Sequence, residues 1–525
     1  MFIIKNATIY DGTGGEGFVS DILVEDGVIA RIHKGIHAPE ARVIDAHGLA
    51  ASPGFIDIHA HSDYSIPADN AASSKIMQGV TTEVSGNCGL SAAPLLGAAA
   101  RQREKDLEEL GLTQSWTDLR GYFDMLESRH PAVNCASFCG HGNLRASVMG
   151  YEDREPTEDE MRKMEDLLAD AMTAGALGLA TGLVYPPGVY CKTDELVRLG
   201  RVAGRFGGVY ASHMRSEGAN VLSAIDEALK VGRQGGLPVE ISHIKTSSPA
   251  NWHLVTDMIE KVEAARAEGL AVTADKYPYT AGSTDLDAIL PPWAYEGGNI
   301  EELKRLTDPV IRAKLRSECL SLYPSDNYWE RVMISSVTTE KNRELEGKRL
   351  SEAAAMRGQD PVDALFDILI EEEIRAGAIF FSQSEENLRT FLKQEWVMVG
   401  SDSTARGMSG VTRQGKPHPR TFGTFPKILG TFVRDEQILT MPQAVRKMSS
   451  MAAEKLGLDG RGYLKEGFFA DIVLFNPETV ADRATYEEPY QFPEGIKYVF
   501  VNGALAVEDG EQTPARAGRV LRPGK

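Results

Sequence analysis

The chain contains little cysteine, no long apolar segment and no excess of basic residues. Each of these absences argues against one class of protein. The five cysteines in 525 residues are an odd number spread along the chain, which makes a poor disulfide framework and favours reduced thiols inside a cell. No run approaches the roughly 18 consecutive apolar residues of a membrane-spanning helix. The formal net charge of −19 argues against binding to a phosphate backbone, which needs clustered lysine and arginine. We therefore expect a cytoplasmic protein with neither nucleic acid nor membrane as a partner.

The first residues also lack the features of an export signal. They alternate apolar and polar side chains up to a turn at Asp11-Gly12, which predicts a strand and not a charged segment followed by an apolar one. No repeat of about 20 to 50 residues and no low-complexity tract is visible. The composition, 42% hydrophobic and 25% charged, is typical of a globular protein. The length suits a barrel of about 250 to 400 residues with appended pieces.

Both ends of the chain contain short strand-like runs separated by turns. Residues 1–52 hold three such runs, and residues 460–525 hold others that are separated by Asn-Gly and Asp-Gly turn signals. Neither end alone buries a sufficient core, and chain termini often meet. We therefore predict that the two ends form one small β-sandwich domain.

Residues 53–459 alternate strand-like apolar runs with helical stretches, which is the pattern of parallel β/α units. Eight runs closing on themselves give an α/β fold of the (β/α)8 TIM barrel class. A ninth run, 378–383, is interpreted as an extra strand or loop before the last barrel strand. The eight barrel runs are 54–61, 81–88, 133–141, 175–183, 208–214, 239–245, 271–277 and 397–403.

The segment 283–340 is too long for a simple connection between barrel elements. We predict that it is an inserted lid segment that covers the active site. The alternative is that it only adds to the outside of the barrel.

Candidate metal ligands fall at the carboxyl ends of the predicted strands, which is the face where barrel enzymes place their sites. His59 and His61 end the first strand, and their spacing puts both imidazoles on one side of it. His213 and His243 end the fifth and sixth strands. Asp402 follows the eighth, where a carboxylate can accept a proton from a metal-bound water. Taken singly each residue has an ordinary structural explanation, but their common position favours one metal site.

Cys88 follows the second strand between glycines that allow a close approach of its backbone and thiol. A thiolate together with imidazoles is a zinc ligand set, although an inert buried thiol is the commoner fate of a free cysteine. His141 ends the third strand within range of the same pocket. We interpret the remaining cysteines as structural: Cys135, Cys139, Cys191 and Cys319.

Taken together, these residues resemble the amidohydrolase superfamily and, within it, the N-acyl-D-amino-acid deacylases, or D-aminoacylases. The resemblance covers essentially the whole chain and is specific as a set. The strings that carry it are PGFIDIHAHSD, GVTTEVSGNCGLSAAP, GALGLATGLVYPPG, YASHMRSEG, ISHIKTS, KYPYTAGST, VMVGSDS, KPHPRTFGTFPKILG and GFFADIVLFNPETV.

The resemblance implies a tightly held Zn²⁺ bound by Cys88, His213 and His243. It implies an adjacent, weaker second site formed by His59, His61 and Asp402. Dihydroorotases and hydantoinases bridge two metals with a carboxylated lysine on the fourth strand. Here that strand, GALGLATGL, has no lysine, so Cys88 is the better candidate for a bridging ligand.

The implied activity is zinc-dependent hydrolysis of the linear amide bond of N-acyl-D-amino acids, with Asp402 acting as general base and then as general acid. The substrate carries a free carboxylate, which calls for cations and phenol donors in the pocket. Lys245, Tyr279 and Arg420 match family positions for that role, and His141 is a further substrate-binding candidate. The expected partner is this small substrate, and formation of a homo-oligomer is left open.

The sequence departs from the family pattern around the site of the substrate's side chain. The run before the eighth strand reads Ser-Gln-Ser-Glu-Glu, which differs from the family pattern. The loop 404–416 is longer than the corresponding loop of the family and carries two arginines. Asp285 and Asp287 would favour a cationic side chain if they face the substrate, although capping the start of a helix is the simpler role for them.

Two alternatives remain. The same scaffold would also suit a hydantoinase- or dipeptidase-like hydrolase of cyclic or linear amides. A non-catalytic barrel serving as a binding module would be expected to have lost ligands, whereas every ligand position is filled here.

Overall fold

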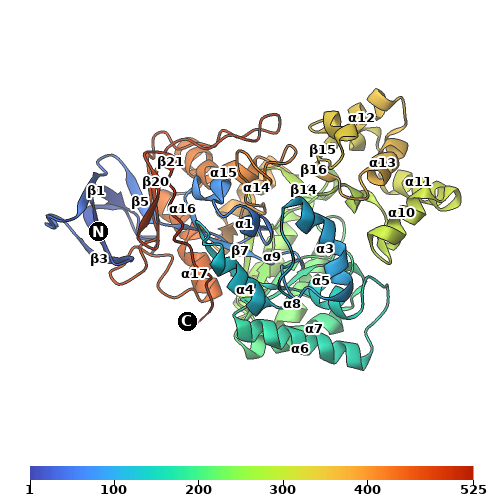
Figure 1. Cartoon of the computed structure of the whole chain (residues 1–525), viewed down its shortest axis with the longest axis horizontal. Helices are drawn as coiled ribbons and strands as arrows, with labels where there is room; N and C mark the ends of the chain where they lie inside the picture. The colour runs from blue at the N-terminus through green and yellow to red at the C-terminus, as the bar shows by residue number, and fades with distance from the viewer. Residues whose placement is uncertain (524–525) are drawn as a thin grey trace.

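Eight parallel strands close into a barrel at the centre of the computed structural model, which describes residues 1–523 (Figure 1). One group of strands pairs in the order β6-β7-β8 and a second in the order β9-β10-β11-β12-β13-β17. β8 and β9 are one strand interrupted at residue 138, and a parallel bridge between Ala60 and Ser403 joins the two outer strands. The barrel strands are β6 (Phe55–Asp57), β7 (Val80–Ser85), β8 (Asn134–Ser137), β9 (Cys139–Gly140), β10 (Gly178–Gly182), β11 (Val209–His213), β12 (Val239–Ile241), β13 (Val272–Lys276) and β17 (Val397–Val399).

Each barrel strand lies in, or overlaps, one of the eight runs predicted from the sequence, so the predicted barrel is confirmed. The strands are short and almost entirely buried, because helices cover the outer face while side chains fill the inside. Because the strands are parallel, the residues that follow each of them all reach the same end of the barrel.

Helices between the strands cover the barrel and start and stop at recognisable signals. The best example is α6, where Thr157 and Glu160 form a reciprocal capping box and Gly175 ends the helix in the left-handed conformation. The helices around the barrel are α1 (Ser65–Ala68), α2 (Ser73–Ile76), α3 (Gly97–Glu109), α4 (Leu119–Ser128), α5 (His141–Val148), α6 (Glu158–Ala174), α7 (Thr193–Arg205), α8 (Val221–Gly235), α9 (Val255–Ala267), α14 (Glu385–Lys393), α15 (Arg420–Lys427), α16 (Met441–Met448) and α17 (Ser450–Leu456).

The two ends of the chain meet in one nine-stranded sheet, beside the barrel in Figure 1. Its order is β21-β20-β19-β18-β5-β1-β2-β3, with β4 beside β1, and the antiparallel pair β5–β18 joins the two ends. A shared core that includes Ile4, Ile22, Ile472 and Phe500 explains why both ends are needed. The strands are β1 (Phe2–Ile9), β2 (Phe18–Glu25), β3 (Val28–His33), β4 (Arg42–Asp45), β5 (Ala50–Pro53), β18 (Ile472–Phe475), β19 (Ile496–Val501), β20 (Ala504–Glu508) and β21 (Glu511–Gln512).

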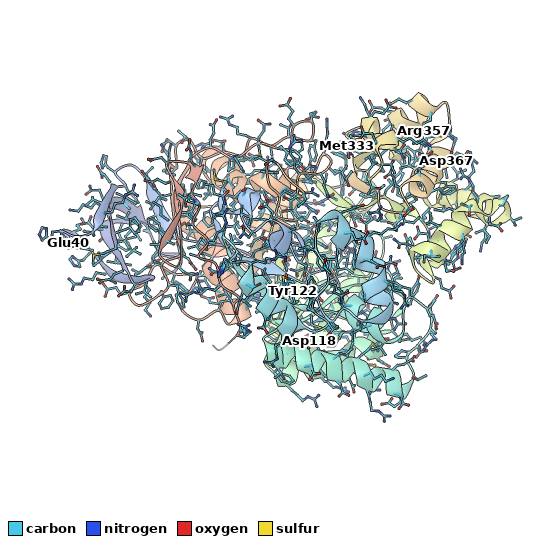
Figure 2. The ribbon with its side chains drawn as sticks, in the orientation of Figure 1. Glu40, Asp118, Tyr122, Met333, Arg357 and Asp367 are labelled. Atoms are coloured by element: carbon cyan, nitrogen blue, oxygen red, sulfur yellow. The ribbon has the colours of Figure 1, made fainter. Side chains whose placement is uncertain are left out.

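An inserted unit between β13 and α14 lies at the end of the molecule opposite the terminal sheet. Figure 2 labels Met333, Arg357 and Asp367 in this unit, far from Glu40, which lies in the turn before β4 of the terminal sheet. It contains an antiparallel sheet in the order β14-β16-β15 and a core of its own that runs from Leu286 to Ala378, past the predicted end at residue 340. Its elements are β14 (Ala281–Asp285), α10 (Asn299–Thr307), α11 (Pro309–Leu322), β15 (Val332–Ser336), α12 (Leu350–Arg357), α13 (Pro361–Glu371) and β16 (Gly377–Phe381).

The run predicted at 378–383 is thus an extra strand, β16, and it belongs to the insertion sheet. The insertion is held to helix α3 of the barrel by ion pairs from Lys105 to Glu373 and from Arg375 to Glu109. None of the helices within residues 1–523 combines the length and apolar character that a bilayer crossing requires.

Glu302 in α10 is a buried carboxyl group whose titration should affect stability. It is 2% exposed, and burial together with Asp287 and Asp285 raises its pKa to about 10. The folded chain therefore keeps a proton that the unfolded chain loses above about pH 4.5, so this group's contribution to stability falls as the pH rises from there toward 10, by at most about 1.4 kcal/mol per pH unit.

Replacing Glu302 with Gln should remove that pH dependence. We expect Glu302→Gln to leave the melting temperature almost unchanged at pH 5 and to raise it by roughly 2 °C or more at pH 8 relative to the parent chain. Thermal unfolding followed by circular dichroism at both pH values measures this. Glu301→Gln, which changes an exposed neighbour, is the control, and equal shifts at the two pH values would contradict the expectation.

Candidate active site

A cavity of about 1370 Å³ opens at the carboxyl end of the barrel strands, between the barrel and the insertion. Its wall includes His61, Cys88, His213, His243 and Asp402. His59 lies just behind this wall and is fully buried. The structure therefore brings all six predicted ligand positions to one place.

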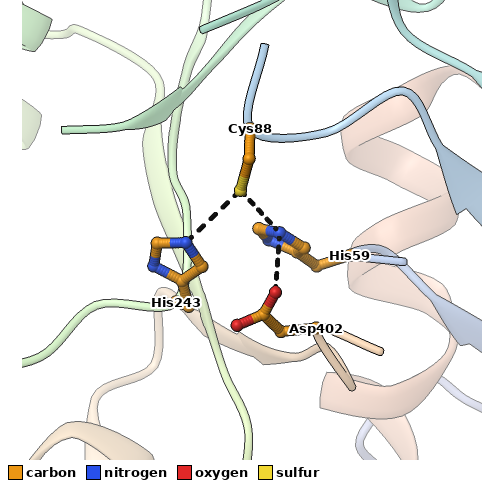
Figure 3. A group of neighbouring side chains, drawn as sticks. All are labelled: His59, Cys88, His243 and Asp402. Atoms are coloured by element: carbon orange, nitrogen blue, oxygen red, sulfur yellow. Dashed lines mark hydrogen bonds and ion pairs between the residues drawn. The ribbon is translucent and has the colours of Figure 1, made fainter. Parts of the chain in front are cut away.

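Cys88 is the centre of the closest cluster, which Figure 3 shows with its neighbours. Its Sγ lies 3.3 Å from Nε2 of His59 and 3.4 Å from Nε2 of His243. Zinc bonds of about 2.0 Å to nitrogen and 2.3 Å to sulfur in a tetrahedral arrangement separate neighbouring ligand atoms by about 3.3 to 3.5 Å. One ligand atom each of His59, Cys88, His243 and Asp402 lies within 4.8 Å of every other. The donor set and its spacing thus fit a zinc ion.

His213 approaches the same cluster from β11. Its Nδ1 lies 3.0 Å from Nε2 of His243, and the two rings are edge to face at 4.4 Å between centroids. Glu217 lies behind the pair, with Oε1 at 3.0 Å from Nδ1 of His243 and 3.9 Å from Nε2 of His213. Cys88 and His243 therefore lie between His59 on one side and His213 on the other. This position of Cys88 suits a cysteine that is shared by two metal sites.

Three of these residues are held in a backbone conformation that side chains with a Cβ rarely adopt. The φ angles are +52° at Cys88, +37° at His243 and +50° at Asp402. Left-handed residues other than glycine are uncommon and store strain of about 1–3 kcal/mol, although aspartate and histidine adopt this conformation more readily than cysteine. All three residues closely follow barrel strands. The strained backbone at these positions indicates that the fold directs the three side chains to one place.

The protonation states also suit a metal ligand set. Burial alone would raise the pKa of the Cys88 thiol, but the imidazoles of His59 and His243 outweigh burial and hold the pKa well below its ordinary value. Burial raises the pKa of each of the other cysteines, as we expect of structural thiols. Thiolate is the form that binds metal, so Cys88 alone of the five is prepared for it.

Asp275, which the sequence did not single out, contacts two histidines of the cluster, His59 and His243. Its Oδ2 lies 3.0 Å from Nδ1 of His59, and its Oδ1 accepts the backbone N–H of His243 at 3.0 Å. A carboxylate on the far nitrogen of a ligating histidine fixes the tautomer and orients the ring. The signal available in the sequence was an acidic residue inside a predicted barrel strand, Val272–Lys276, where a buried charge needs a partner.

Asp402 lies between the histidine pair and a guanidinium. Oδ1 is 3.1 Å from Nε2 of His61 and 3.5 Å from Nε2 of His59, while Oδ2 is 2.8 Å from Nη1 of Arg420. Burial would raise the pKa of Asp402, but Arg420 and the histidines hold it well below the usual range. The carboxylate is therefore ionised and able to accept a proton.

Lys245 and Arg420 form a cationic wall of the cavity beside Asp402. Lys245 has its Nζ 2.8 Å from Nδ1 of His243 and is paired with Glu217. The guanidinium of Arg420 lies 4.6 Å from the ring centroid of Tyr277, and Nζ of Lys245 lies 5.9 Å from it. Two predicted substrate-binding residues thus face the cavity together with a tyrosine that was not predicted.

Two other predicted substrate-binding residues do not line the cavity. Tyr279 donates its hydroxyl to Asp482 at 3.1 Å, so the neighbouring Tyr277 occupies the place expected for it. A shift of two residues keeps both tyrosines on the same side of an extended chain, and the sequence alone does not separate them. His141 is fully buried, with Nε2 2.8 Å from Glu195, and that carboxylate is also paired with Arg145.

The family model described as "Amidohydrolase family" matches residues 42–507. A D-aminoacylase of Alcaligenes xylosoxydans xylosoxydans is 35% identical over 99% of this chain and 97% of its own length. An N-acyl-D-glutamate deacylase of the same organism is 37% identical over 99% and 96%.

Solved structures agree with these relatives. A D-aminoacylase described as having a binuclear metal centre superposes with a TM-score of 0.83 at 35% identity, covering 99% of both chains. The N-acyl-D-glutamate deacylase of Bordetella bronchiseptica, in complex with zinc and a phosphonate mimic of the tetrahedral intermediate, gives the same TM-score at 34% identity, again over 99% of both chains.

Proposed function

Because the chain belongs to the amidohydrolase family and is an enzyme of the D-aminoacylase type, we propose that it hydrolyses N-acyl-D-amino acids to a carboxylate and a free D-amino acid. The observation that carries the proposal is the cluster in which Cys88 lies between His59 and His243 with Asp402 beside them. Hydantoinase-like chemistry is less well supported, because no lysine occurs on β10 to bridge two metals.

The ligand set would hold zinc in two neighbouring positions. Cys88, His213 and His243 would hold the tighter ion, and His59, His61 and Asp402 would form the weaker site. When bound, zinc supplies Lewis acidity that polarises an amide carbonyl and brings the pKa of water toward neutrality.

Asp402 would carry the proton. Its carboxylate is ionised and lies at the cavity wall, so it can accept a proton from the attacking water and return it to the leaving nitrogen. Arg420 holds Oδ2 at 2.8 Å and leaves Oδ1, on the side of the histidines, for that exchange. Asp402 is thus general base and then general acid.

The wall formed by Lys245, Arg420 and Tyr277 would bind the substrate's free carboxylate. Burial lowers the pKa of Lys245, but the neighbouring Glu217 and Tyr277 outweigh burial, so the ammonium is kept charged. The insertion, through β14 and its ion pairs to α3, would close the cavity over the bound substrate and keep bulk water out.

A substrate screen tests the proposal. The purified chain, loaded with zinc, is assayed against N-acetyl-D-amino acids, their L-forms, hydantoins and D,D-dipeptides. Hydrolysis of the linear amides is followed by the free amine released, and opening of the hydantoin ring by the N-carbamoyl amino acid formed. We expect N-acetyl-D-amino acids to be hydrolysed with kcat/KM at least about 100-fold above their L-forms, since one misplaced substituent at the reacting centre costs about that much. Preference for hydantoins or dipeptides would favour the alternative hydrolases.

A further inference from the structure

The strand ends that carry His59, His61 and Asp402 meet at a seam of the barrel. Along residues 1–523, β6, which leads to the two histidines, shares no strand ladder with β17, which leads to Asp402. The N–H of Asp402 donates to the carbonyl of His59 at 2.7 Å, and the N–H of His61 donates to the carbonyl of Ser403 at 3.1 Å. Because ladder hydrogen bonds are missing between the two strands, the geometry of the seam depends on side chains as well.

Lys75 of helix α2 reaches this seam with a fully buried side chain. Its Nζ donates to Oδ2 of Asp57 at 2.8 Å, to Oγ of Ser401 at 2.8 Å and to the carbonyl of Ser403 at 3.0 Å. Oε1 of Glu83, in β7, lies 3.4 Å away as a further neighbour. An ammonium group has three N–H donors, so all of them are used to join the end of β6 to the segment that follows β17.

Two of these contacts are made on either side of Asp402. Ser401 precedes it and Ser403 follows it, while Asp402 itself has the left-handed φ of +50°. Ser401 is held a second time, because its N–H donates to Oδ1 of Asp57 at 2.8 Å and its hydroxyl donates to Oδ2. A strained residue keeps its conformation only when the surrounding structure enforces it. Here both neighbours of the strained residue are bound to one ammonium group.

The same network reaches the two histidines. Asp57 lies two residues before His59, and its Oδ1 accepts the N–H of His59 at 3.4 Å. The carbonyl of Ser403, which accepts from Lys75, also accepts the N–H of His61. Lys75 is fully buried and outside the cavity wall, so it acts through these neighbours and does not touch substrate.

A second buried lysine shows what a purely structural role looks like on the same strand. Lys447 is 4% exposed and binds at the amino-terminal end of β17, where its Nζ donates to the carbonyl of Val397 at 2.8 Å and to that of Gln394. It contacts a single segment at the end of the barrel opposite the cavity. Lys75 instead joins two strands at the point where the residues of the site leave them.

We propose that Lys75 is a positioning residue: its buried ammonium group holds Ser401 and Ser403 so that the carboxylate of Asp402 stays directed at the histidine pair. The inference rests on the proposed function, which gives Asp402 its part in proton transfer. The distances at stake are 3.1 Å from Oδ1 to Nε2 of His61 and 2.8 Å from Oδ2 to Nη1 of Arg420. A displacement of about 1 Å in a reacting group costs about 100-fold in rate.

The first test removes the ammonium group without leaving its partner charged. Loss of one member of a buried ion pair is strongly destabilising, whereas loss of both is often tolerated. The variant is therefore Lys75→Met combined with Asp57→Asn. We expect its kcat for the best substrate of the screen to fall at least about tenfold. KM should change less than about threefold, because Lys245 and Arg420 still bind the carboxylate of the substrate.

The matched control is Lys447→Met, which removes the other buried lysine of β17. It should lower the melting temperature and keep the parent kcat. Full kcat in a folded double variant, or an equal loss of kcat in Lys447→Met, would overturn the inference. If the double variant does not fold, Ser401→Ala takes its place, because it removes one acceptor of the ammonium group and keeps the ion pair with Asp57. A loss of kcat of at least about threefold is then expected, and parent activity would overturn the inference.

The second test does not depend on turnover. Crystal structures of the zinc-loaded parent and of the folded variant compare the position of the Asp402 carboxylate relative to His61 and Arg420. A carboxylate displaced by about 1 Å supports the inference even if the parent hydrolyses no N-acyl-D-amino acid, in which case only the proposed function fails. A carboxylate that keeps its place in the variant would overturn the inference and leave the proposed function standing.

Discussion

Replacing Cys88 with Ala should remove most of the zinc and nearly all of the activity. The thiolate lies 3.3 Å and 3.4 Å from its two nearest imidazoles, so its loss leaves His213 and His243 as the only members of the proposed tight site. A catalytic zinc site typically uses three protein ligands, and removing one opens the site to exchange. We expect zinc content to fall below about a tenth of the parent value and kcat/KM to fall at least about 1000-fold.

Metal content by mass spectrometry and hydrolysis of the best substrate of the screen measure this effect. Cys319→Ala is the matched control, because it removes a buried thiol from the core of the insertion, far from the cluster. Circular dichroism and the melting temperature of both variants separate loss of metal from loss of folding. Full zinc occupancy in Cys88→Ala would show that the ligand set proposed here is wrong.

Replacing Asp402 with Asn should abolish the proton transfer while keeping the shape of the site. The amide has no carboxylate to accept the proton from water, so kcat should fall by about 100- to 10,000-fold, the usual contribution of a general base. KM should change little, because the cationic wall of Lys245 and Arg420 remains. Zinc at the tight site should persist, since Cys88, His213 and His243 are untouched.

Steady-state kinetics and zinc content of the same preparation test this expectation. Asp435→Asn, which alters an exposed carboxylate paired with Arg434, is the control and should behave like the parent. A variant that loses kcat and zinc together would show that Asp402 acts mainly as a ligand. A variant that keeps kcat would show that another group carries the proton.

The order of side chains along the barrel strands was predictable because strand periodicity and barrel topology are local and general rules. His59, His61, His213, His243 and Asp402 each end an apolar run, and parallel strands place such ends on one face. Nothing more than the sequence was needed to bring them together. Cys88 needed the resemblance to a family as well, since a single cysteine beside glycines has many ordinary explanations.

The residues that support the site were less accessible to sequence reasoning. Asp275 and Glu217 act through hydrogen bonds to histidines on other strands, and such partners are chosen by side-chain direction in three dimensions. Side-chain direction in three dimensions also explains why Tyr277 faces the cavity and the predicted Tyr279 does not. The bend of the chain into the insertion decides which of the two rings faces the cavity.

The sequence by itself determined the barrel, the sheet shared by both ends and the residues that meet at the carboxyl ends of the strands, because hydrophobic periodicity and chain direction decide these. Only the tertiary structure decided which charged and polar groups meet. Asp402 gains Arg420, and the left-handed backbone at Cys88 aims a thiolate between two imidazoles. Charge compensation and strain depend on distances between segments far apart in the chain, which no local pattern encodes.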